Sequence, residues 1–295
     1  TSTDNTPWDY VNYSDEHYQW AKERSANPSV EDVRIDPSNS ALWAYMGSNN
    51  WNDYFFSKSN FSQYHTLSFS GSSGNKKMPI GYLLSADYTN ENGLNKLSRD
   101  DWNRYGLRAR VNFTPLEWLK VDNNLLVYQL ERDAPTYAIT DLYYLQPTNV
   151  AKNPDGSWGN NAAGRLASQL TSGGRNTQDR FGFQNIFRGT ATFLDGDLSI
   201  AGDASFKREL WKYHTENLPY TVGYGPNDIR IENPIGSITE THGTIKQDVF
   251  DLYANYGKTF GMHGFKVMAG FNQESYEWSP LSASRSQVIS SSVPY

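Results

Sequence analysis

Residues 105–113 alternate strictly between apolar and polar side chains, and this alternation limits what the chain can fold into. The even positions hold glycine, arginine and asparagine, and the odd positions hold apolar residues: Tyr105, Leu107, Ala109, Val111 and Phe113. Successive side chains of a β-strand point to opposite faces of a sheet, so this strand has one apolar and one charged face. A slip of one residue would exchange the two faces, so the surroundings of each face set the register.

The same rhythm runs from residue 63 onward and predicts eight strands. They are Tyr64–Ser70, Ile80–Tyr88, Tyr105–Phe113, Trp118–Leu130, Phe181–Phe193, Leu198–Trp211, Val249–Lys258 and Phe265–Tyr276. Short connections rich in Gly, Pro, Asp and Asn alternate with long ones; the short ones are 71–77, 114–117, 194–197 and 260–264, and the long ones are 89–102, 132–178 and 214–245. The fourth strand has consecutive asparagines and consecutive leucines, so its register stays open.

Short turns on one rim and long loops on the other are typical of an outer-membrane barrel. Most predicted strands have about 9 to 14 residues, which suits a tilted membrane crossing better than the usual 5–6 of globular sheets. Aromatic residues near strand ends, such as Tyr88, Phe193 and Phe265, match interfacial girdles. The predicted fold is all-β: an antiparallel transmembrane β-barrel with about eight strands in this chain. A half-buried sheet with its polar face in water is the alternative.

Composition removes several other classes of protein. The chain has 295 residues and no cysteine, which excludes disulfide frameworks and thiolate metal sites. Its net charge of −6 is opposite to the basic surface that a general nucleic-acid binder needs. Mean hydropathy is −0.70, and no stretch approaches the length of a membrane-spanning helix.

Residues 1–62 lack this rhythm and form the first of two predicted parts, the second being the strand region 63–295. Ser14 is placed to cap a short helix over about 15–25. The segment 27–40 looks like loop, and no period is evident in the aromatic-rich residues that follow it. We expect the first part to be largely irregular and extracellular.

Two sets of side chains are candidate functional residues. The first is polar and opposite the apolar face, where it is expected to line a lumen: Arg108, Arg110, Asn112, Asp203 and Lys207. Arginine or lysine on the lipid side would cost roughly 2–4 kcal/mol near the midplane. The second set lies in the long connections, where aromatic rings beside Asn, Asp and Gln can stack on sugars: Trp158, Tyr220 and Tyr224. Packing of the loops is the competing explanation for the second set.

No constellation indicates catalysis or a resident metal. The five histidines are scattered without ligand spacing, and adjacent carboxylates such as Asp100–Asp101 are read as solvated loop charges. The segment 153–161 lacks the EF-hand order of ligands and is expected to form consecutive turns, although calcium binding by the long loops stays open. We therefore predict a protein that is not an enzyme and has no cofactor or metal.

The stretch from about 50 to 125 also resembles a known family, the SusC-like TonB-dependent outer-membrane transporters. The matching motifs are a Trp-x-Asp step, strands with the patterns H-x-L-S-x-S-G and Y-x-x-S-x-x-Y, an Asn-Gly turn, and strands with R-Y-x-x-R and W-L-K. In this sequence they are Trp51 and Asp53; His65, Leu67, Ser68, Ser70 and Gly71; Tyr82, Ser85 and Tyr88; Asn92 and Gly93; Arg104, Tyr105 and Arg108; and Trp118, Leu119 and Lys120.

The resemblance implies a 22-stranded barrel filled by a plug, a SusD-like surface lipoprotein as partner and the TonB complex as energy source. Eight strands are about a third of such a barrel, and neither a plug nor a TonB-box segment is recognisable in the chain. We therefore expect a fragment of the barrel region, with TonB contacts made by regions outside this chain.

The leading functional hypothesis is a component of a nutrient importer in the outer membrane of a Gram-negative bacterium. It would take up glycan oligosaccharides, or peptides as in some relatives, without contacting nucleic acid. One alternative is a secreted all-β carbohydrate-binding protein or glycoside hydrolase. Another is a small eight-stranded outer-membrane barrel that closes on itself.

Overall fold

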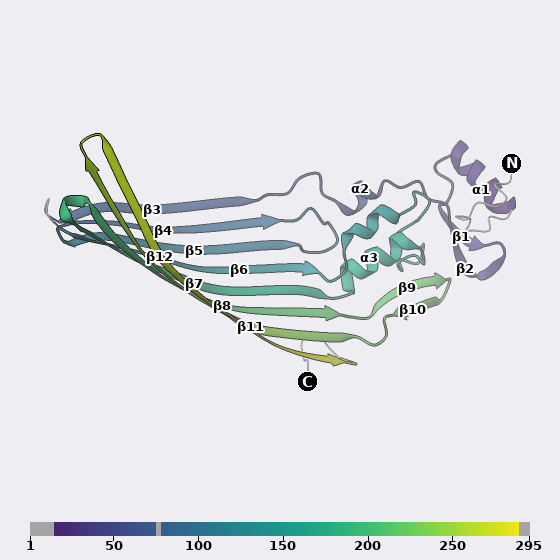
Figure 1. Cartoon of the computed structure of the whole chain (residues 1–295). Helices are drawn as coiled ribbons and strands as arrows, with labels where there is room; N and C mark the ends of the chain where they lie inside the picture. The colour runs from purple at the N-terminus through teal and green to yellow at the C-terminus, as the bar shows by residue number, and fades with distance from the viewer. Residues whose placement is uncertain (1–14, 75–77, 289–295) are drawn as a thin grey trace.

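The computed structural model describes residues 15–74 and 78–288. Eight long strands form one antiparallel sheet in the order β12-β11-β8-β7-β6-β5-β4-β3 (Figure 1). Their bounds are β3 Gln63–Gly74, β4 Pro79–Asn92, β5 Asp101–Leu116, β6 Leu119–Pro135, β7 Arg175–Phe193, β8 Leu198–Asn217, β11 Ser237–Phe260 and β12 His263–Ser286. The fold is therefore all-β, as predicted.

Each predicted strand coincides with one of these eight, apart from Trp118 at the edge of the fourth. The observed strands are longer, from 12 residues in β3 to 24 in β11 and β12. The difference arises because backbone pairing continues beyond the apolar alternation into segments where both faces are polar. In such segments no apolar alternation marks the chain as a strand, although the ladder of hydrogen bonds is unbroken.

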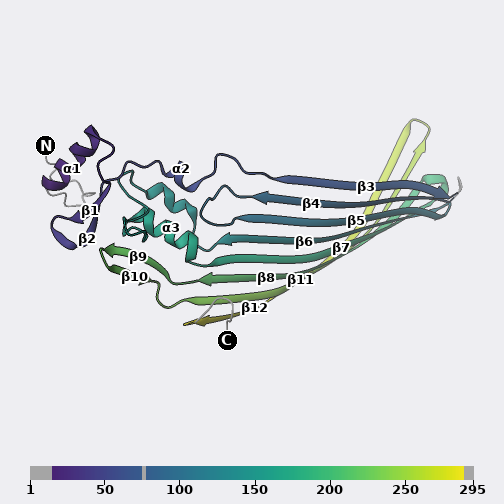
Figure 2. The same cartoon turned by 180° about the vertical axis from the view of Figure 1, so that it is seen from behind.

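The short connections gather at one end of the sheet, opposite the helices (Figures 1 and 2). Between β7 and β8 the chain reverses through η2 (Leu194–Gly196), where Leu194, Asp195 and Gly196 have φ values of 54°, 55° and 100°. Left-handed backbone of this kind is easy for glycine and costly for leucine, so the tightness of the turn imposes it. Residues 75–77 of the first short connection, like the predicted cap Ser14, lie outside the described residues.

One face of the sheet carries apolar side chains on every strand, and on β8, β11 and β12 it also carries two ion pairs, Arg208 with Asp248 and Lys246 with Glu277. Cross-strand pairs place Leu84 of β4 beside both Phe69 and Ala109, and Leu252 of β11 beside Phe271. Large apolar side chains on this face are exposed, for example Leu67 at 78% and Phe271 at 61%. We call it the apolar face, and the opposite side, which carries Arg108 and its equivalents, the polar face.

The register of β6, which the sequence left open, is decided by its neighbours. Leu125 pairs with Ala109 of β5 on the apolar face, so Leu126 lies on the polar face. Asn123 also falls on the apolar face, where its amide nitrogen donates to the side-chain oxygen of Asn185 on β7 at 2.6 Å. This hydrogen bond pairs one amide donor with one amide acceptor, which lowers the cost of placing the two side chains among apolar neighbours.

The other elements lie at the end of the sheet opposite the short turns, and we call them the end unit (Figure 2). They are α1 Asp15–Ala26, β1 Val33–Asp36, β2 Asn39–Tyr45, α2 Trp51–Phe55, η1 Ile139–Tyr144, α3 Ala162–Ser172, β9 Tyr220–Gly225 and β10 Asp228–Glu232. β1 pairs with β2, and β9 pairs with β10.

One expectation about the irregular segments was wrong. The segment 27–40 is not only loop, because Val33–Asp36 forms a hairpin with β2. The long connection 214–245 contains the hairpin β9–β10, which the alternation did not reveal. Strands of four to six residues are too short to establish a period, and β9 has buried residues on both faces, so alternation is lost. The expected helix near 15–25 is present as α1.

The buried core lies in the end unit and not in the long sheet. Its larger cluster joins α2, α3 and a residue before α3: Trp51, Phe55, Ala151, Ala163, Leu166, Ala167 and Leu170. Asn161 caps α3, its side chain accepting hydrogen bonds from the backbone of Ala163 and Gly164. Among the described residues, no helix has the length and apolar character needed to cross a membrane.

We predict that Gly225→Ala loosens the contact between β9 and β2. An added Cβ would lie 1.7 Å from the backbone oxygen of Ala41, so one of the two hairpins must move. Overpacking of this kind costs roughly 1–3 kcal/mol, or about 5- to 150-fold in local opening. Hydrogen exchange of residues 39–45 measures it. Gly189→Ala, where a Cβ meets nothing within 4 Å, is the matched control; equal exchange in both variants would contradict the prediction.

Candidate functional site

All five predicted polar residues lie on the polar face. Arg108, Arg110 and Asn112 alternate along β5, and Asp203 and Lys207 lie on β8. Asp203 forms an ion pair with Arg188 of β7 at 2.5 Å, and the ammonium of Lys207 lies 3.8 Å from Glu209. The register of the sheet thus places these side chains together on one side, as the alternation indicated.

Glu209 is the centre of a network on the polar face that sequence reasoning missed. It is only 5% exposed, and the guanidinium of Arg180 lies 3.7 Å from its carboxylate. The hydroxyl of Tyr128 donates a hydrogen bond to the same carboxylate. A buried carboxylate needs such partners, because burial without them would cost several kcal/mol.

Glycine makes this network possible. Tyr128 lies on β6 and Glu209 on β8, with Gly182 of β7 between them in the register. A Cβ at Gly182 would lie 2.5 Å from the ring carbon Cζ of Tyr128, so only glycine lets the ring pass over the intervening strand. The cross-strand neighbours 128, 182 and 209 are far apart in sequence, so the network is recognisable only once all three strands are aligned.

Arg108 and Arg110 differ from most other cations of the polar face. Among the described residues they form neither an ion pair within 4.0 Å nor a side-chain hydrogen bond. Arg104, on the same strand, forms an ion pair with Asp87, and its guanidinium nitrogen lies 2.8 Å from the carboxylate oxygen. Arg108 and Arg110 are exposed on the polar face, so their guanidinium groups are free to bind a carboxylate from elsewhere.

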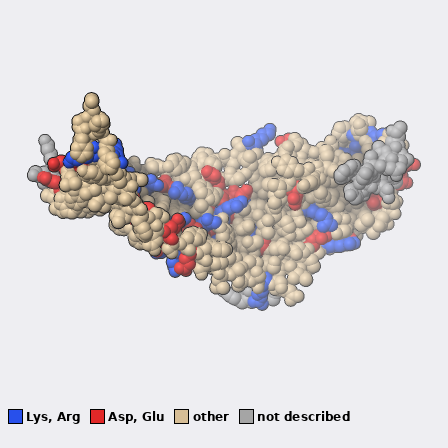
Figure 3. Space-filling model, in the orientation of Figure 1, with Lys and Arg blue, Asp and Glu red and all other residues tan. Residues whose placement is uncertain are grey.

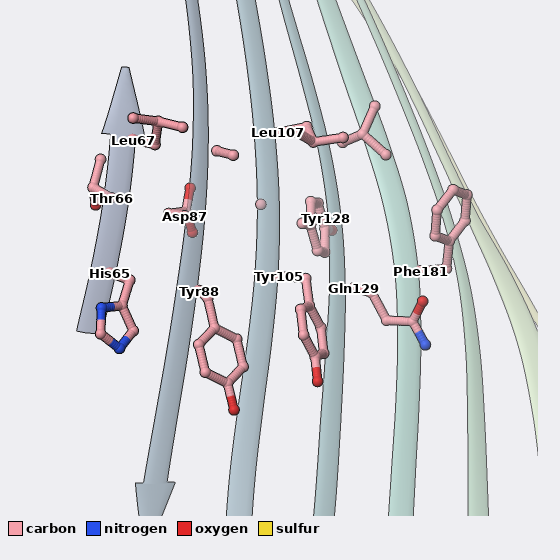
Figure 4. Close-up of a pocket in the computed structure, with 13 residues that line it drawn as sticks. His65, Thr66, Leu67, Asp87, Tyr88, Tyr105, Leu107, Tyr128, Gln129 and Phe181 are labelled. Atoms are coloured by element: carbon pink, nitrogen blue, oxygen red, sulfur yellow. The ribbon is translucent and has the colours of Figure 1, made fainter. Parts of the chain in front are cut away.

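The apolar face has a hollow of about 580 Å³ near the aromatic ends of β4 and β5 (Figure 4). Tyr88 and Tyr105 lie side by side there, with ring centroids 5.1 Å apart, and Leu67 and Leu107 lie next to them. The carboxylate of Asp87 is engaged by Arg104. Aromatic and aliphatic side chains thus make up much of the lining of the hollow, as in a contact surface.

The three predicted aromatic residues all lie in the end unit, and each has partners there. Tyr220 is 8% exposed, its ring packs edge-on against Tyr137, and its hydroxyl accepts from Gln169 at 3.0 Å. Burial makes its ring inaccessible to a ligand in this structure. Packing therefore accounts for Tyr220.

Trp158 and Tyr224 are half-buried and lie against cations. The ammonium of Lys152 lies 3.6 Å from the ring centroid of Trp158, and the guanidinium of Arg230 lies 4.0 Å from that of Tyr224. The Tyr224 hydroxyl donates to Glu232 at 2.7 Å. This hydrogen bond holds the pKa of Glu232 below its ordinary value against the opposing effect of burial, with Arg165 contributing further.

Asn153 is a further buried polar residue of the end unit. It is 4% exposed; its amide donates to the backbone oxygen of Gly223 at 3.0 Å, and its side-chain oxygen accepts from Tyr45 at 3.0 Å. Burial raises the pKa of Tyr45 to about 12. The segment that begins at Asn153 turns as expected, with Asp155 accepting from the Ser157 backbone. Within the described ranges, no group of His, Asp and Glu could hold a metal ion.

A charged cluster joins β8 and β11 at the ends of these strands that lie nearest the end unit. On β8 the cluster lies beyond Leu210, which is the last large apolar residue of the apolar face on that strand. His214 lies between two carboxylates, with Nδ1 2.6 Å from Glu240 and Nε2 3.3 Å from Glu216. Lys212 and His242 each lie 3.6 Å from Glu240. Burial lowers the pKa of His214, but hydrogen bonds to Glu240 and Glu216 outweigh burial and raise it.

Glu216 connects this cluster to the end unit. Its second carboxylate oxygen accepts from the backbone N–H of Arg175 at 3.0 Å, and its backbone oxygen accepts from Thr136. Gly174, between α3 and β7, has φ of 108°, and a Cβ there would lie 2.5 Å from the Glu216 backbone oxygen. The His214 imidazole is thus linked through Glu216 to the junction between the sheet and the end unit.

Charges of both signs are interspersed over the face seen in Figure 3. No single-sign patch of the kind that binds nucleic acid is visible in that view.

Solved structures with a similar fold are those of the RagAB peptide importer. One in a closed-closed state has 16% identity and a TM-score of 0.64, covering 91% of this chain and 29% of that chain. A structure described as the RagAB peptide transporter has 16% identity and a TM-score of 0.66, covering 95% and 32%. The sheet is part of a β-barrel fold.

The likeness to RagAB rests on fold, which agrees with that expected from the resemblance to SusC-like barrels. This chain spans about a third of the length of the RagAB chains that it matches. No family model and no curated protein sequence matches it.

We predict that the His214 junction weakens as pH rises. The folded state raises the His214 pKa above its ordinary value of about 6.5, so this stabilisation is complete below that value and is lost as pH rises through the folded-state pKa. Thermal melting of the parent protein between pH 6 and 8.5 should show a fall in stability that His214→Gln reduces. His263→Gln, in the β11–β12 turn region, is the control. A pH dependence that His214→Gln leaves intact would overturn the prediction.

Proposed function

We propose that the chain is part of the barrel wall of an outer-membrane nutrient importer. The observation that carries the proposal is the single registered sheet with exposed large apolar side chains on one face of every long strand and a charged opposite face. A soluble protein rarely exposes an apolar area of this extent, whereas hydrocarbon covers it at no cost. In the proposed barrel the apolar face contacts lipid, and Arg108, Arg110, Asn112, Asp203 and Lys207 face the lumen.

The proposed orientation follows from the two ends of the sheet. Short turns such as 114–117 and 194–197 face the periplasm, and the end unit with the long connections 132–178 and 214–245 is extracellular. Barrels of this class have that asymmetry. The end unit, with its own buried core, is folded enough to act outside the membrane.

We propose that transport is active and TonB-dependent and uses a SusD-like surface lipoprotein, with TonB contacts outside this chain. The similar structures are named as a two-component peptide importer, which supports a partner and a peptide cargo. Oligosaccharides remain the alternative cargo. Trp158 and Tyr224 are the proposed cargo- or partner-contacting aromatics, because their rings are only half-buried. The role is transport and not catalysis.

The other two hypotheses have less support. A soluble carbohydrate-binding protein or hydrolase would need the exposed apolar face to be covered by a second sheet or by helices, and the end unit lies at the end of the strands instead (Figure 1). A self-closed eight-stranded barrel would need β12 to pair with β3. Within residues 15–74 and 78–288 these two strands are opposite edges of the sheet.

The lipid contact has a direct test. Spin labels at Leu107, Ala109, Val111, Ile200 and Phe206 of the parent protein in membranes should be accessible to oxygen and shielded from polar relaxants. Labels at Arg110 and Asn112, on the same strand, are matched controls and should behave in the opposite way. This segment has no cysteine, so labelling sites can be introduced one at a time. Similar accessibility on the two faces would sink the barrel-wall proposal.

The orientation is tested separately by protease added to intact cells. Cleavage is expected within 132–178 or 214–245 and absent from 114–117 and 194–197, because only the former are proposed to be outside. Fragments are identified by mass spectrometry, and permeabilised cells provide the control. Cleavage confined to the short turns would invert the topology.

A further inference from the structure

The starting observation is an uneven distribution of counter-ions on the polar face. Several of its cations have a carboxylate within 4.0 Å: Arg104, Lys120, Arg180, Arg188 and Lys207. Arg108 and Arg110 have none among the described residues, and both are exposed. Arg132 also lacks one, but it lies further along the sheet toward the end unit.

The cross-strand neighbours of the two arginines are uncharged. Arg108 pairs with Ser85 and Leu126, and Arg110 pairs with Leu83 and Asn124. Two like charges therefore lie two residues apart on one strand with only neutral side chains directly opposite them. Such an arrangement leaves both guanidinium groups able to donate bidentate hydrogen bonds to a carboxylate.

The position of Arg108 and Arg110 along β5 strengthens their attraction for an anion. Leu107, Ala109 and Val111, which alternate with the arginines along β5, belong to the apolar face. In the proposed barrel both arginines are thus level with the hydrocarbon and point inward. Attraction to an anion is stronger in a lumen than at an open surface, because its low-dielectric walls focus the field of the charges that line it.

We propose that Arg108 and Arg110 bind the carboxylates of an acidic peptide cargo; this inference rests on the proposed import function. Their Cα atoms are two strand residues apart, or about 6.6 Å at 3.3 Å per residue. An extended peptide repeats its same-side residues at the same spacing. Acidic residues at positions i and i+2 of a peptide lying along β5 therefore match both guanidinium groups, a match that favours peptide over acidic oligosaccharide.

The test uses the full parent protein in energised cells and purified in detergent. The probes are Gly-Glu-Gly-Glu-Gly, its Gln counterpart Gly-Gln-Gly-Gln-Gly and an oligogalacturonate. Wild-type protein should bind and import the Glu peptide in preference to the Gln peptide. Arg108→Gln and Arg110→Gln should each weaken binding of the Glu peptide by about tenfold or more, the range of a charge-assisted hydrogen bond. Binding of the Gln peptide should not change.

Two further variants separate cargo binding from structural effects. Arg108→Lys keeps the charge without the planar fork and should retain part of the preference for the Glu peptide. Arg132→Gln removes an unpaired arginine elsewhere on the same face and should leave the preference intact. Heat-modifiable migration and amount in the membrane establish that each variant is folded.

The outcomes that overturn the proposal are distinct from failure of the import function. Equal losses for the Glu and Gln peptides in Arg108→Gln and Arg110→Gln would assign the arginines to contacts within the parent barrel. Preference for oligogalacturonate over the Glu peptide would assign them to an acidic sugar. Wild-type protein that imports neither peptides nor oligosaccharides would instead contradict the proposed function.

Discussion

The hydrogen-bond ladder of the eight-stranded sheet is the constraint on which the rest of the structure depends. Every neighbouring pair is antiparallel, and pairs such as Leu84 with Ala109 hold like side chains opposite one another. A slip by one residue in β5 would bring Arg108 and Arg110 to the apolar face. The separation of the two faces, and with it every proposed role, follows from one register.

Among the described residues, both clusters of buried apolar side chains lie outside the long sheet, which leaves large apolar side chains exposed on its apolar face. The buried apolar clusters lie in the end unit, around Phe55 and Leu166 and around Trp20. On the polar face, Glu209 and its partners supply local order, but Arg108 and Arg110 are left for other groups. Edge strands β3 and β12 also carry backbone groups without a strand partner on their outer sides, as expected for part of a larger barrel.

Prediction from the sequence succeeded for features that the alternation of apolar and polar residues within a single strand reveals. Tyr105 to Phe113 has a clear alternation, so its faces and the positions of Arg108 and Arg110 followed directly. It failed for β1 and did not reveal β9, because both strands are too short for a period. The burial of Tyr220 depends on Tyr137 and Gln169 from another connection. The Glu209 network was invisible because its members come from three strands that only the register aligns.

By itself, the sequence determined the number and order of the long strands, the identity of the two faces and the class of fold, because alternation is a local property of the backbone. Tertiary structure alone decided the register of β6, the engagement of Tyr220 and Tyr224 in packing, and the link from His214 through Glu216 to the end unit. Those features depend on distances between residues far apart in the chain, which are set only when the strands pair and the end unit packs.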